Sequence, residues 1–250
     1  MNFLFEKIEG IIIRTLDYGE THKIVTLFTK EKGKVAAIAR GAKKTKSRMA
    51  AITQPFVHGS FLMQGGSGLG TLQQGEVISS FRKIREDIVK TAYASYLAEL
   101  TEKILDERIP DQFFYQQFMA TLQAITDEKD PEIVTMMYEL KLYKKAGFAP
   151  VLYQCAICNK NNTLHAFSVK EGGLLCQKCL SSDLESVVLS STLVKLLQAF
   201  SDVNIERIGN ISVKPENKKI LQQLMESYYE QYGGFFIKSK KFLKQLDLFI

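Results

Sequence analysis

The four cysteines of this chain form two Cys-x-x-Cys pairs, and this spacing constrains the fold more than any other feature. The first pair is Cys155 and Cys158, and the second, after seventeen intervening residues, is Cys176 and Cys179. Two such pairs on either side of a hairpin-sized stretch can place four thiolates tetrahedrally around one zinc ion. Because four thiolates fill the coordination shell, the sequence predicts one structural zinc ion that folds the loop 151–182 around it.

Two other uses of these cysteines compete with zinc. Disulfides would suit a secreted chain, but residues 1–16 mix charged with apolar side chains and do not resemble a signal peptide. We therefore expect a cytoplasmic protein whose thiols stay reduced. An iron site of the rubredoxin kind is the remaining alternative, because tetrahedral sulfur also suits iron. His165 lies inside the loop but is not needed as a ligand.

Length and hydropathy indicate an ordinary globular protein. With 250 residues, 46% of them hydrophobic, the chain can bury a sizeable core and is expected to contain about two domains. No apolar run approaches the roughly 18 residues that a membrane-spanning helix needs. We expect a soluble protein without a membrane segment.

Positive charge is concentrated near the N-terminus. The formal net charge is +6, and residues 32–48 contain seven bases and no acid. Such a field attracts a polyanion and releases its counterions on binding, which makes nucleic acid the obvious partner. A basic run can also be only a solvated loop. A second, weaker candidate patch lies in the C-terminal tail, at Lys238, Lys240 and Lys241.

Apolar periodicity predicts an α+β protein with two architectures. Residues 1–80 contain five strand-like segments, at 8–16, 22–28, 34–39, 55–63 and 69–78, with Gly33 free to take positive φ in a tight turn. Five strands in a small domain suggest an OB-fold barrel. From residue 82 the period becomes helical, so we expect a mainly α-helical domain, 81–250, that carries the zinc loop as an insertion. Helices are expected after the N-cap residues Asp111 and Asp130, with Gly147 ending the second of these.

Catalytic motifs are missing from the sequence. It contains no nucleophile elbow, no His-Glu-x-x-His and no nucleotide-binding lysine motif. The adjacent carboxylates at 86–87 and 127–128 are better explained as charges at helix ends than as metal ligands. We therefore predict a binding protein rather than an enzyme.

Several segments, read in order, closely resemble the bacterial RecO family of recombination and repair mediators over essentially the whole chain. They are Gly10-Ile-Ile-Ile-Arg14, Tyr18-Gly-Glu20, Leu27-Phe-Thr-Lys-Glu-Lys-Gly-Lys34, Ala39-Arg-Gly-Ala-Lys-Lys44, Gln54-Pro-Phe56, Tyr96-Leu-Ala-Glu-Leu100, Tyr138-Glu-Leu-Lys141, Gly147-Phe-Ala-Pro150 and the four cysteines. The resemblance implies an OB-fold, a helical domain with a zinc site, and no enzymatic activity. It also implies binding to single- and double-stranded DNA, strand annealing, association with RecR and with single-stranded-DNA-binding protein, and a functional link to RecA.

The resemblance also assigns residues by position. The implied DNA surface of the barrel consists of Lys34, Arg40, Lys43, Lys44, Lys46 and Arg48, to which we add Arg14 and Tyr18. Some family members use basic residues just before the Glu-Leu-Lys stretch to contact single-stranded-DNA-binding protein, but this chain has Met136 and Met137 there. Lys141, Lys144 and Lys145 follow on the same predicted helix and are the alternative candidates. From composition alone, an RNA-binding or ribosome-associated OB-fold and zinc protein remains the competing hypothesis.

Overall fold

The computed structural model describes residues 5–65, 68–209 and 211–246. The chain divides into two compact units, one of residues 1–128 together with 237–250 and the other of residues 129–236. The sequence predicts a domain boundary near residue 80, and the last barrel strand ends at Ser79. The helices that follow, up to Glu128, nevertheless group with the barrel as one compact unit.

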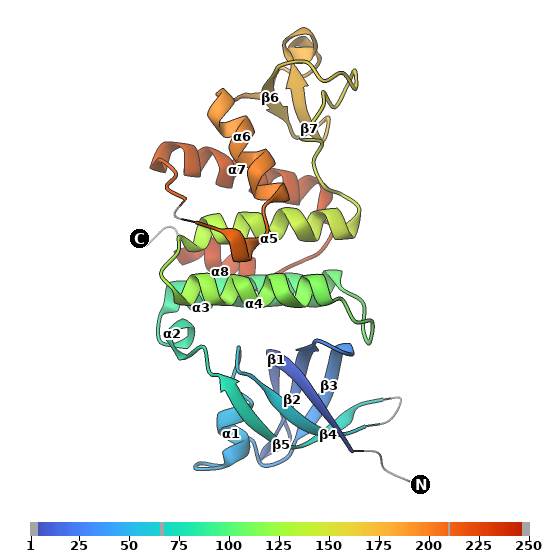
Figure 1. Ribbon diagram of the computed structural model, residues 1–250, viewed down its shortest axis with the longest axis vertical. Helices are drawn as coiled ribbons and strands as arrows, with labels where there is room; N and C mark the ends of the chain where they lie inside the picture. The colour runs from blue at the N-terminus through green and yellow to red at the C-terminus, as the bar shows by residue number, and fades with distance from the viewer. Residues whose placement is uncertain (1–4, 66–67, 210, 247–250) are drawn as a thin grey trace. The chain divides into compact units, whose positions relative to one another are not determined.

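A closed five-stranded barrel forms the core of the first unit (Figure 1). Its strands, in the order β1-β2-β3-β5-β4 around the barrel, are β1 Phe5–Tyr18, β2 His22–Thr29, β3 Gly33–Ala39, β4 His58–Gln64 and β5 Gly70–Ser79. All neighbours are antiparallel except β3 and β5, which are parallel. Apolar side chains fill the interior, among them Ile12, Leu27, Ala37, Phe61 and Leu72. The predicted OB-like barrel is therefore confirmed.

Gly33 shows why a glycine occupies the turn between β2 and β3. Its φ is +64°, and a Cβ there would lie 2.1 Å from the carbonyl oxygen of Ile109. The hydroxyl of Thr29 closes the turn by donating to the Gly33 carbonyl at 2.8 Å. Positive φ and close backbone approach together require a residue without a side chain.

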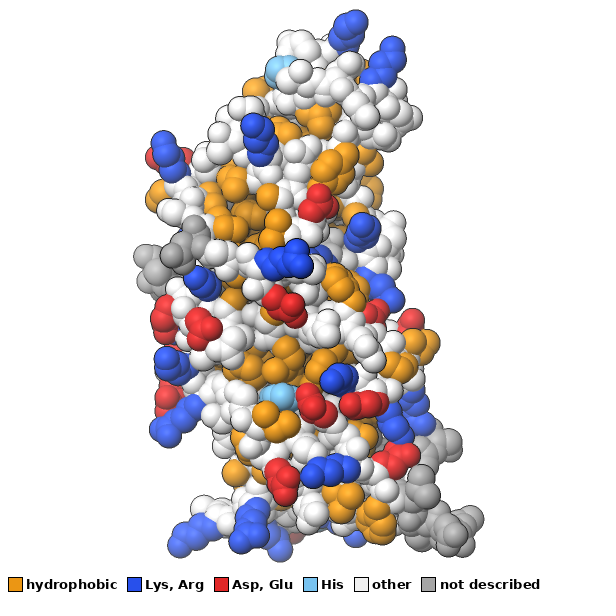
Figure 2. Space-filling view, in the orientation of Figure 1, with side chains coloured by type: hydrophobic (Ala, Val, Ile, Leu, Met, Phe, Trp, Pro, Cys, Tyr) orange, Lys and Arg blue, Asp and Glu red, His pale blue; other side chains and the backbone are white. Residues whose placement is uncertain are grey.

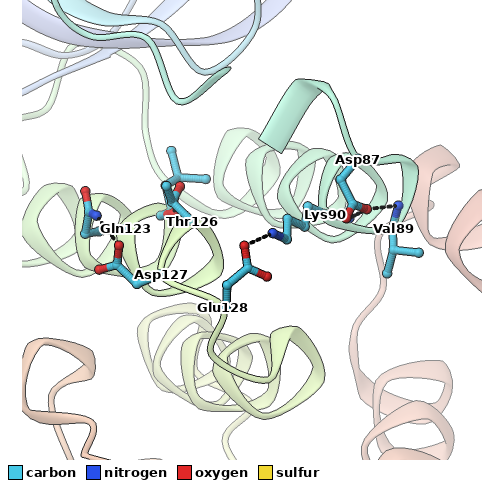
Figure 3. Close-up of polar contacts among 8 residues, drawn as sticks. Asp87, Val89, Lys90, Gln123, Thr126, Asp127 and Glu128 are labelled. Carbon is cyan, nitrogen blue, oxygen red and sulfur yellow. Dashed lines mark hydrogen bonds and ion pairs between the residues drawn. The ribbon is translucent and has the colours of Figure 1, made fainter. Parts of the chain in front are cut away.

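The described residues of the first unit also form five helices. They are α1 Arg48–Ile52, α2 Arg82–Arg85, α3 Ile88–Ile104, α4 Gln112–Thr126 and α8 Lys238–Leu246. Asp87 caps α3 by accepting hydrogen bonds from the N–H groups of Val89 and Lys90 (Figure 3). The ammonium of Lys90 in turn pairs with Glu128 at 2.6 Å (Figure 3). The carboxylates predicted to be helix-end charges thus cap and join helix ends, as their sequence positions suggested.

The second unit combines three longer helices with a small sheet. The helices are α5 Pro131–Ala146, α6 Ser191–Asp202 and α7 Pro215–Tyr232, and the sheet, in the order β7-β6-β8, contains β6 Leu164–Ser168, β7 Gly173–Cys176 and β8 Val187–Val188. The predicted caps of α5 are present, since Asp130 accepts from the Glu132 N–H and Gly147 takes a φ of +83°. Two short 3-10 helices, Gln177–Ser182 and Ile205–Arg207, follow β7 and α6.

An aromatic cluster packs the core of the second unit. The centroid of the Tyr143 ring lies 4.8 Å from that of Phe148 and 5.8 Å from that of Tyr229. The rings of Phe167 and Tyr228 pack edge to face, with their centroids 5.8 Å apart. Burial of these rings joins α5, α7 and the small sheet. Across the ranges that the structure describes, no helix combines the length and apolar character needed to span a bilayer.

Candidate metal centre and nucleic-acid interface

The four cysteines converge at one end of the small sheet of the second unit. Cys155 and Cys158 lie in a turn before β6, where the Ala156 N–H donates to the Leu174 carbonyl of β7 at 2.8 Å. Cys176 ends β7, and Cys179 lies in the 3-10 helix that follows. Apolar side chains, including Leu164, Leu175 and Leu180, pack around the sulfurs. The β6–β7 hairpin between the two cysteine pairs therefore brings the four sulfur atoms together.

The geometry of the four sulfurs fits one metal ion. All four Sγ atoms lie within 4.8 Å of one another, and the Sγ atoms of Cys158 and Cys176 are 3.8 Å apart. A tetrahedron with metal–sulfur distances of about 2.3 Å has edges of about 3.8 Å. The cysteines are free thiols and form no disulfide among themselves. The quartet can thus hold one metal ion with no ligand position left for substrate, which makes the ion structural.

The electrostatics of the quartet also favour a cation. Burial would raise the pKa of the Cys155 thiol, but the N–H groups of Ile157, Cys158 and Cys176 lower its pKa to about 6. Burial and the three neighbouring sulfurs instead raise the pKa of Cys179 to about 12. Four thiolates in so small a volume repel one another, and a divalent cation removes that repulsion.

A basic loop, residues 40–48, lies at one edge of the barrel and leads into α1. Figure 2 shows Lys and Arg side chains gathered over the part of the barrel where Figure 1 places α1. Arg40, Lys43, Lys44, Lys46 and Arg48 are all exposed. Lys43 pairs with Asp17 at 2.9 Å, whereas the other four have no carboxylate partner among the described residues. The loop therefore presents a concentrated positive surface to solvent.

Backbone hydrogen bonds hold the basic loop in place. The Lys43 N–H donates to the Thr21 carbonyl at 3.0 Å, and the Gly41 N–H donates to Nδ1 of His22 at 3.0 Å. Ser47 caps α1 by accepting from the Met49 N–H. Sequence reasoning missed the role of His22, because nothing local in the sequence links a histidine at the start of β2 to a loop nineteen residues later. The loop is an ordered part of the barrel, not only a solvated connection.

Lys34 does not belong to this surface, contrary to the prediction. It is only 7% exposed, and its ammonium donates to the backbone carbonyl of Glu102 on α3. Burial lowers the pKa of Lys34, although the nearby carboxylates of Glu102 and Glu107 oppose that shift. Lys34 therefore ties β3 to the end of α3, and its charge is not available to a polyanion.

Arg14 and Tyr18 occupy the exposed half of β1. The Arg14 guanidinium pairs with the Glu102 carboxylate at 2.8 Å, so part of its charge is already compensated. Tyr18 ends β1 with 48% of its surface exposed. Its ring is thus open to solvent on the same barrel edge that carries the turn 19–21, to which the basic loop is bonded.

Within the second unit, the candidate partner residues on α5 separate into buried and exposed sets. Lys141 is 5% exposed and donates to the carbonyl oxygens of Phe200 and Ser201 at the end of α6, at 3.2 and 3.4 Å. Burial lowers the pKa of Lys141 to about 8. Lys141 is therefore a structural lysine, and its prediction as a contact for a partner or DNA is wrong. Lys144 and Lys145 are exposed in the last turn of α5, and Met136 and Met137 are buried.

The lysines of the C-terminal tail lie on α8. The Glu99 carboxylate of α3 receives hydrogen bonds from the Lys238 and Ser239 N–H groups at 3.0 and 2.9 Å, which fixes the start of this helix. Lys238 and Lys241 are exposed, whereas the Lys240 ammonium lies 5.8 Å from the centre of the Tyr96 ring. The tail patch thus adds two exposed cations to the barrel unit.

Comparison with known proteins identifies the family. Residues 1–81 match the family model described as Recombination protein O N terminal, and residues 85–241 match the one described as Recombination protein O C terminal. The chain belongs to the RecO family. A protein of Oceanobacillus iheyensis named DNA repair protein RecO is 57% identical over 99% of this chain and 96% of its own length. Proteins of the same name from Bacillus cereus strain AH187 and Bacillus anthracis are 46% identical over 98% of this chain and 99% of theirs.

Membership of the RecO family confirms the resemblance that the motifs indicated. Each of the two family models covers one of the predicted parts of the chain, with the junction between residues 81 and 85 just beyond β5. The metal-binding quartet falls inside the C-terminal match and the basic loop inside the N-terminal match. A role in DNA repair follows from the family.

Proposed function

We propose that this chain binds single- and double-stranded DNA through the basic loop and anneals complementary strands, without catalysing a chemical step. The observation that carries the proposal is an ordered, exposed cluster of cations on an OB-like barrel in a chain of a DNA repair family. Four of these cations have no carboxylate partner in the described ranges. Lysine and arginine contacts to phosphate carry no sequence information, so binding has little sequence preference and weakens with salt.

Annealing follows from the same electrostatics. Two complementary strands repel each other through their phosphates, and a surface that neutralises the backbone lowers this repulsion. Because the cations contact phosphate, the base edges stay free to pair. The protein then needs no nucleophile or catalytic metal, which agrees with a closed four-cysteine site.

The proposal includes the protein partners that the family resemblance implies. With RecR, the chain helps to load RecA onto DNA coated by single-stranded-DNA-binding protein. Lys144 and Lys145, exposed at the C-terminal end of α5, provide the positive charge that contacts single-stranded-DNA-binding protein. Lys238 and Lys241 provide a second DNA contact on the barrel unit. Because its proposed ligand is DNA, the protein is in this proposal cytoplasmic and associated with the nucleoid.

The ion held by the cysteine quartet is, in this proposal, one zinc. Zinc prefers four thiolates in a tetrahedron, as the sulfur geometry provides, and its role is to hold the β6–β7 hairpin and the preceding turn together. Metal analysis of the purified protein tests the identity. One equivalent of zinc supports it, and one equivalent of iron with thiolate-to-iron absorption contradicts it.

The test of function is the annealing rate of two complementary fluorescent oligonucleotides coated with the cognate single-stranded-DNA-binding protein. We expect faster annealing in the presence of this protein, and the acceleration should fade as salt rises. Unchanged annealing with intact DNA binding would refute the annealing role. RNA that displaces single-stranded DNA efficiently at equal nucleotide concentration would favour an RNA-binding protein instead.

A further inference from the structure

A hollow on the outer surface of the barrel lies directly beside the basic loop. It has a volume of about 420 Å³ and is bounded by α1 and by the outer faces of β4 and β5. Figure 1 shows α1 next to β5. Arg48, the last cation of the basic loop, is also part of the wall of the hollow. A strand whose phosphates lie on the loop would therefore pass the mouth of this hollow.

A β-bulge gives the hollow its polar lining. In the pairing of β4 with β5, Leu62 is opposite Gln74 but Met63 is opposite Leu72, so Gln73 is an extra residue in β5. Consecutive residues of a regular strand point to opposite faces, and a bulge changes that alternation. Gln73 and Gln74 consequently both line the same hollow, although they are neighbours in the chain.

The side chains around the hollow suit a flat, polar-edged ring. Met49, Ile52 and Leu62 supply apolar surface. The amide of Gln73 donates to Gln64 at 2.8 Å, which orients it, while the Gln74 amide makes no hydrogen bond within the described ranges. An amide offers both a donor and an acceptor, as a base edge does, so it can pair with any of the four bases.

Three charged side chains line the hollow: the cations Lys7 and Arg48 and the anion Glu76. Glu76 pairs with the exposed ammonium of Lys7 at 3.5 Å, so these two charges offset each other. A carboxylate repels a phosphate but accepts hydrogen bonds from the amino groups of bases. Arg48, which belongs to the basic loop, can therefore contact a phosphate at the wall of the hollow, whereas Gln74 and Glu76 offer hydrogen-bond partners to a base.

We propose that this hollow takes one unstacked nucleobase of a single strand whose phosphates lie on the basic loop. The inference rests on the proposed DNA binding and adds to it a base-binding subsite, lined by Gln73 and Gln74, on the outer face of β4 and β5. Holding one base out of the stack fixes the path of the strand past Arg48. The remaining bases stay free for pairing.

The test compares two fluorescent strands that carry the same phosphates. One is oligothymidylate of about 12 nucleotides, within the site size of an OB-fold, and the other is an abasic strand of equal length built from tetrahydrofuran units. Affinities of the full-length, metal-loaded protein are measured by fluorescence anisotropy. We expect the base-bearing strand to bind about tenfold more tightly, and we expect Q74A to lose most of that preference without changing the affinity for the abasic strand.

Controls separate the base subsite from other causes. Gln116→Ala changes an exposed glutamine on α4 and should leave both affinities unchanged. A second measurement is independent of variants: 4-thiothymidine in the strand should photo-crosslink to the segment 73–76. Equal binding of the two strands by the wild type would overturn the subsite. So would a preference for the base-bearing strand that survives in Q74A but disappears in Y18A. Crosslinks confined to segments other than 73–76 would overturn it as well. Failure of both strands to bind would instead refute the proposed function itself.

Discussion

Neutralising three cations of the basic loop should change the salt dependence of DNA binding by a calculable amount. Arg40, Lys44 and Lys46 are exposed and have no carboxylate partner among the described residues. We expect the triple variant R40A/K44A/K46A to bind single-stranded DNA more weakly and with a flatter dependence on salt, because fewer counterions are released. Arg48 stays in place, so the base subsite keeps its wall.

The expected size follows from counterion release. Each phosphate contact to a single strand contributes about 0.7 to the slope of log K against log salt, so three lost contacts reduce that slope by about 2. If the two proteins bind equally at 1 M salt, the variant binds about 100-fold more weakly at 0.1 M salt. Anisotropy titrations with oligothymidylate over a salt series measure both quantities.

A charge-matched control decides whether position matters. The variant K195A/K214A/K219A removes three exposed lysines from α6, α7 and the residue before α7, and lowers the net charge equally. If the control flattens the slope as much as the loop variant does, the effect is one of net charge and the reasoning about the loop is refuted. An unchanged slope in the loop variant would refute it equally.

Four further changes test other parts of the structure. Cys176→Ala should lose the metal and melt the second unit while the barrel still binds DNA weakly, as metal analysis and near-ultraviolet circular dichroism will show. Lys34→Met should lower the free energy of unfolding by about 1–3 kcal/mol without changing the salt slope, because its partner is a backbone carbonyl. Gly33→Ala should cost at least about 3 kcal/mol in urea unfolding. The pKa of Lys141 is lowered from 10.5 to about 8, so between these pH values the unfolded chain binds more protons than the folded protein. The free energy of unfolding therefore rises with pH over this range, by up to about 3 kcal/mol. Lys141→Met should abolish this rise.

Each of these changes has a matched control. Ser181→Ala alters an exposed residue of the same 3-10 helix as Cys179 and should keep the metal. Lys30→Met alters an exposed lysine near Lys34 in the sequence, and Lys195→Met alters an exposed lysine of α6. Both variants should leave stability and its pH dependence unchanged. Gly19→Ala also has positive φ but nothing within 4 Å of its Cβ, so it should cost only about 1 kcal/mol. A control that behaved like its partner variant would show that the named contact is not the cause.

Local signals explain how much of the fold the sequence could predict. Five strand-like segments and the glycine at residue 33 indicated the barrel, and the caps Asp111, Asp130 and Gly147 marked helix ends that the structure reproduces. The cysteine spacing indicated a metal site because the ligands are paired within short turns. The bulge at Gln73 was not predictable, since it depends on the register between two strands and leaves no mark in the composition of either.

Buried lysines show where sequence reasoning fails. Every residue from Ile133 to Tyr143 on α5 is buried, so this helix has no solvent side in its middle, and Lys141 is enclosed with the rest. The carbonyl oxygens that accept hydrogen bonds from its buried ammonium, at the end of α6, belong to residues 59 and 60 positions away in the chain. Lys34 similarly depends on Glu102, at a separation of 68 residues. A charged residue is predicted to be exposed unless its distant partner is known.

Counting bases along the sequence therefore overstates the charge that DNA can meet. Of the seven bases in residues 32–48, Lys34 is buried, Lys32 pairs with Glu6 and Lys43 pairs with Asp17. The four that remain are Arg40, Lys44, Lys46 and Arg48. At about 0.7 per contact, they account for a slope of about 3 on a single strand. A steeper measured slope would mean that further cations take part, and Lys238 and Lys241 on α8 are two exposed candidates on the same unit.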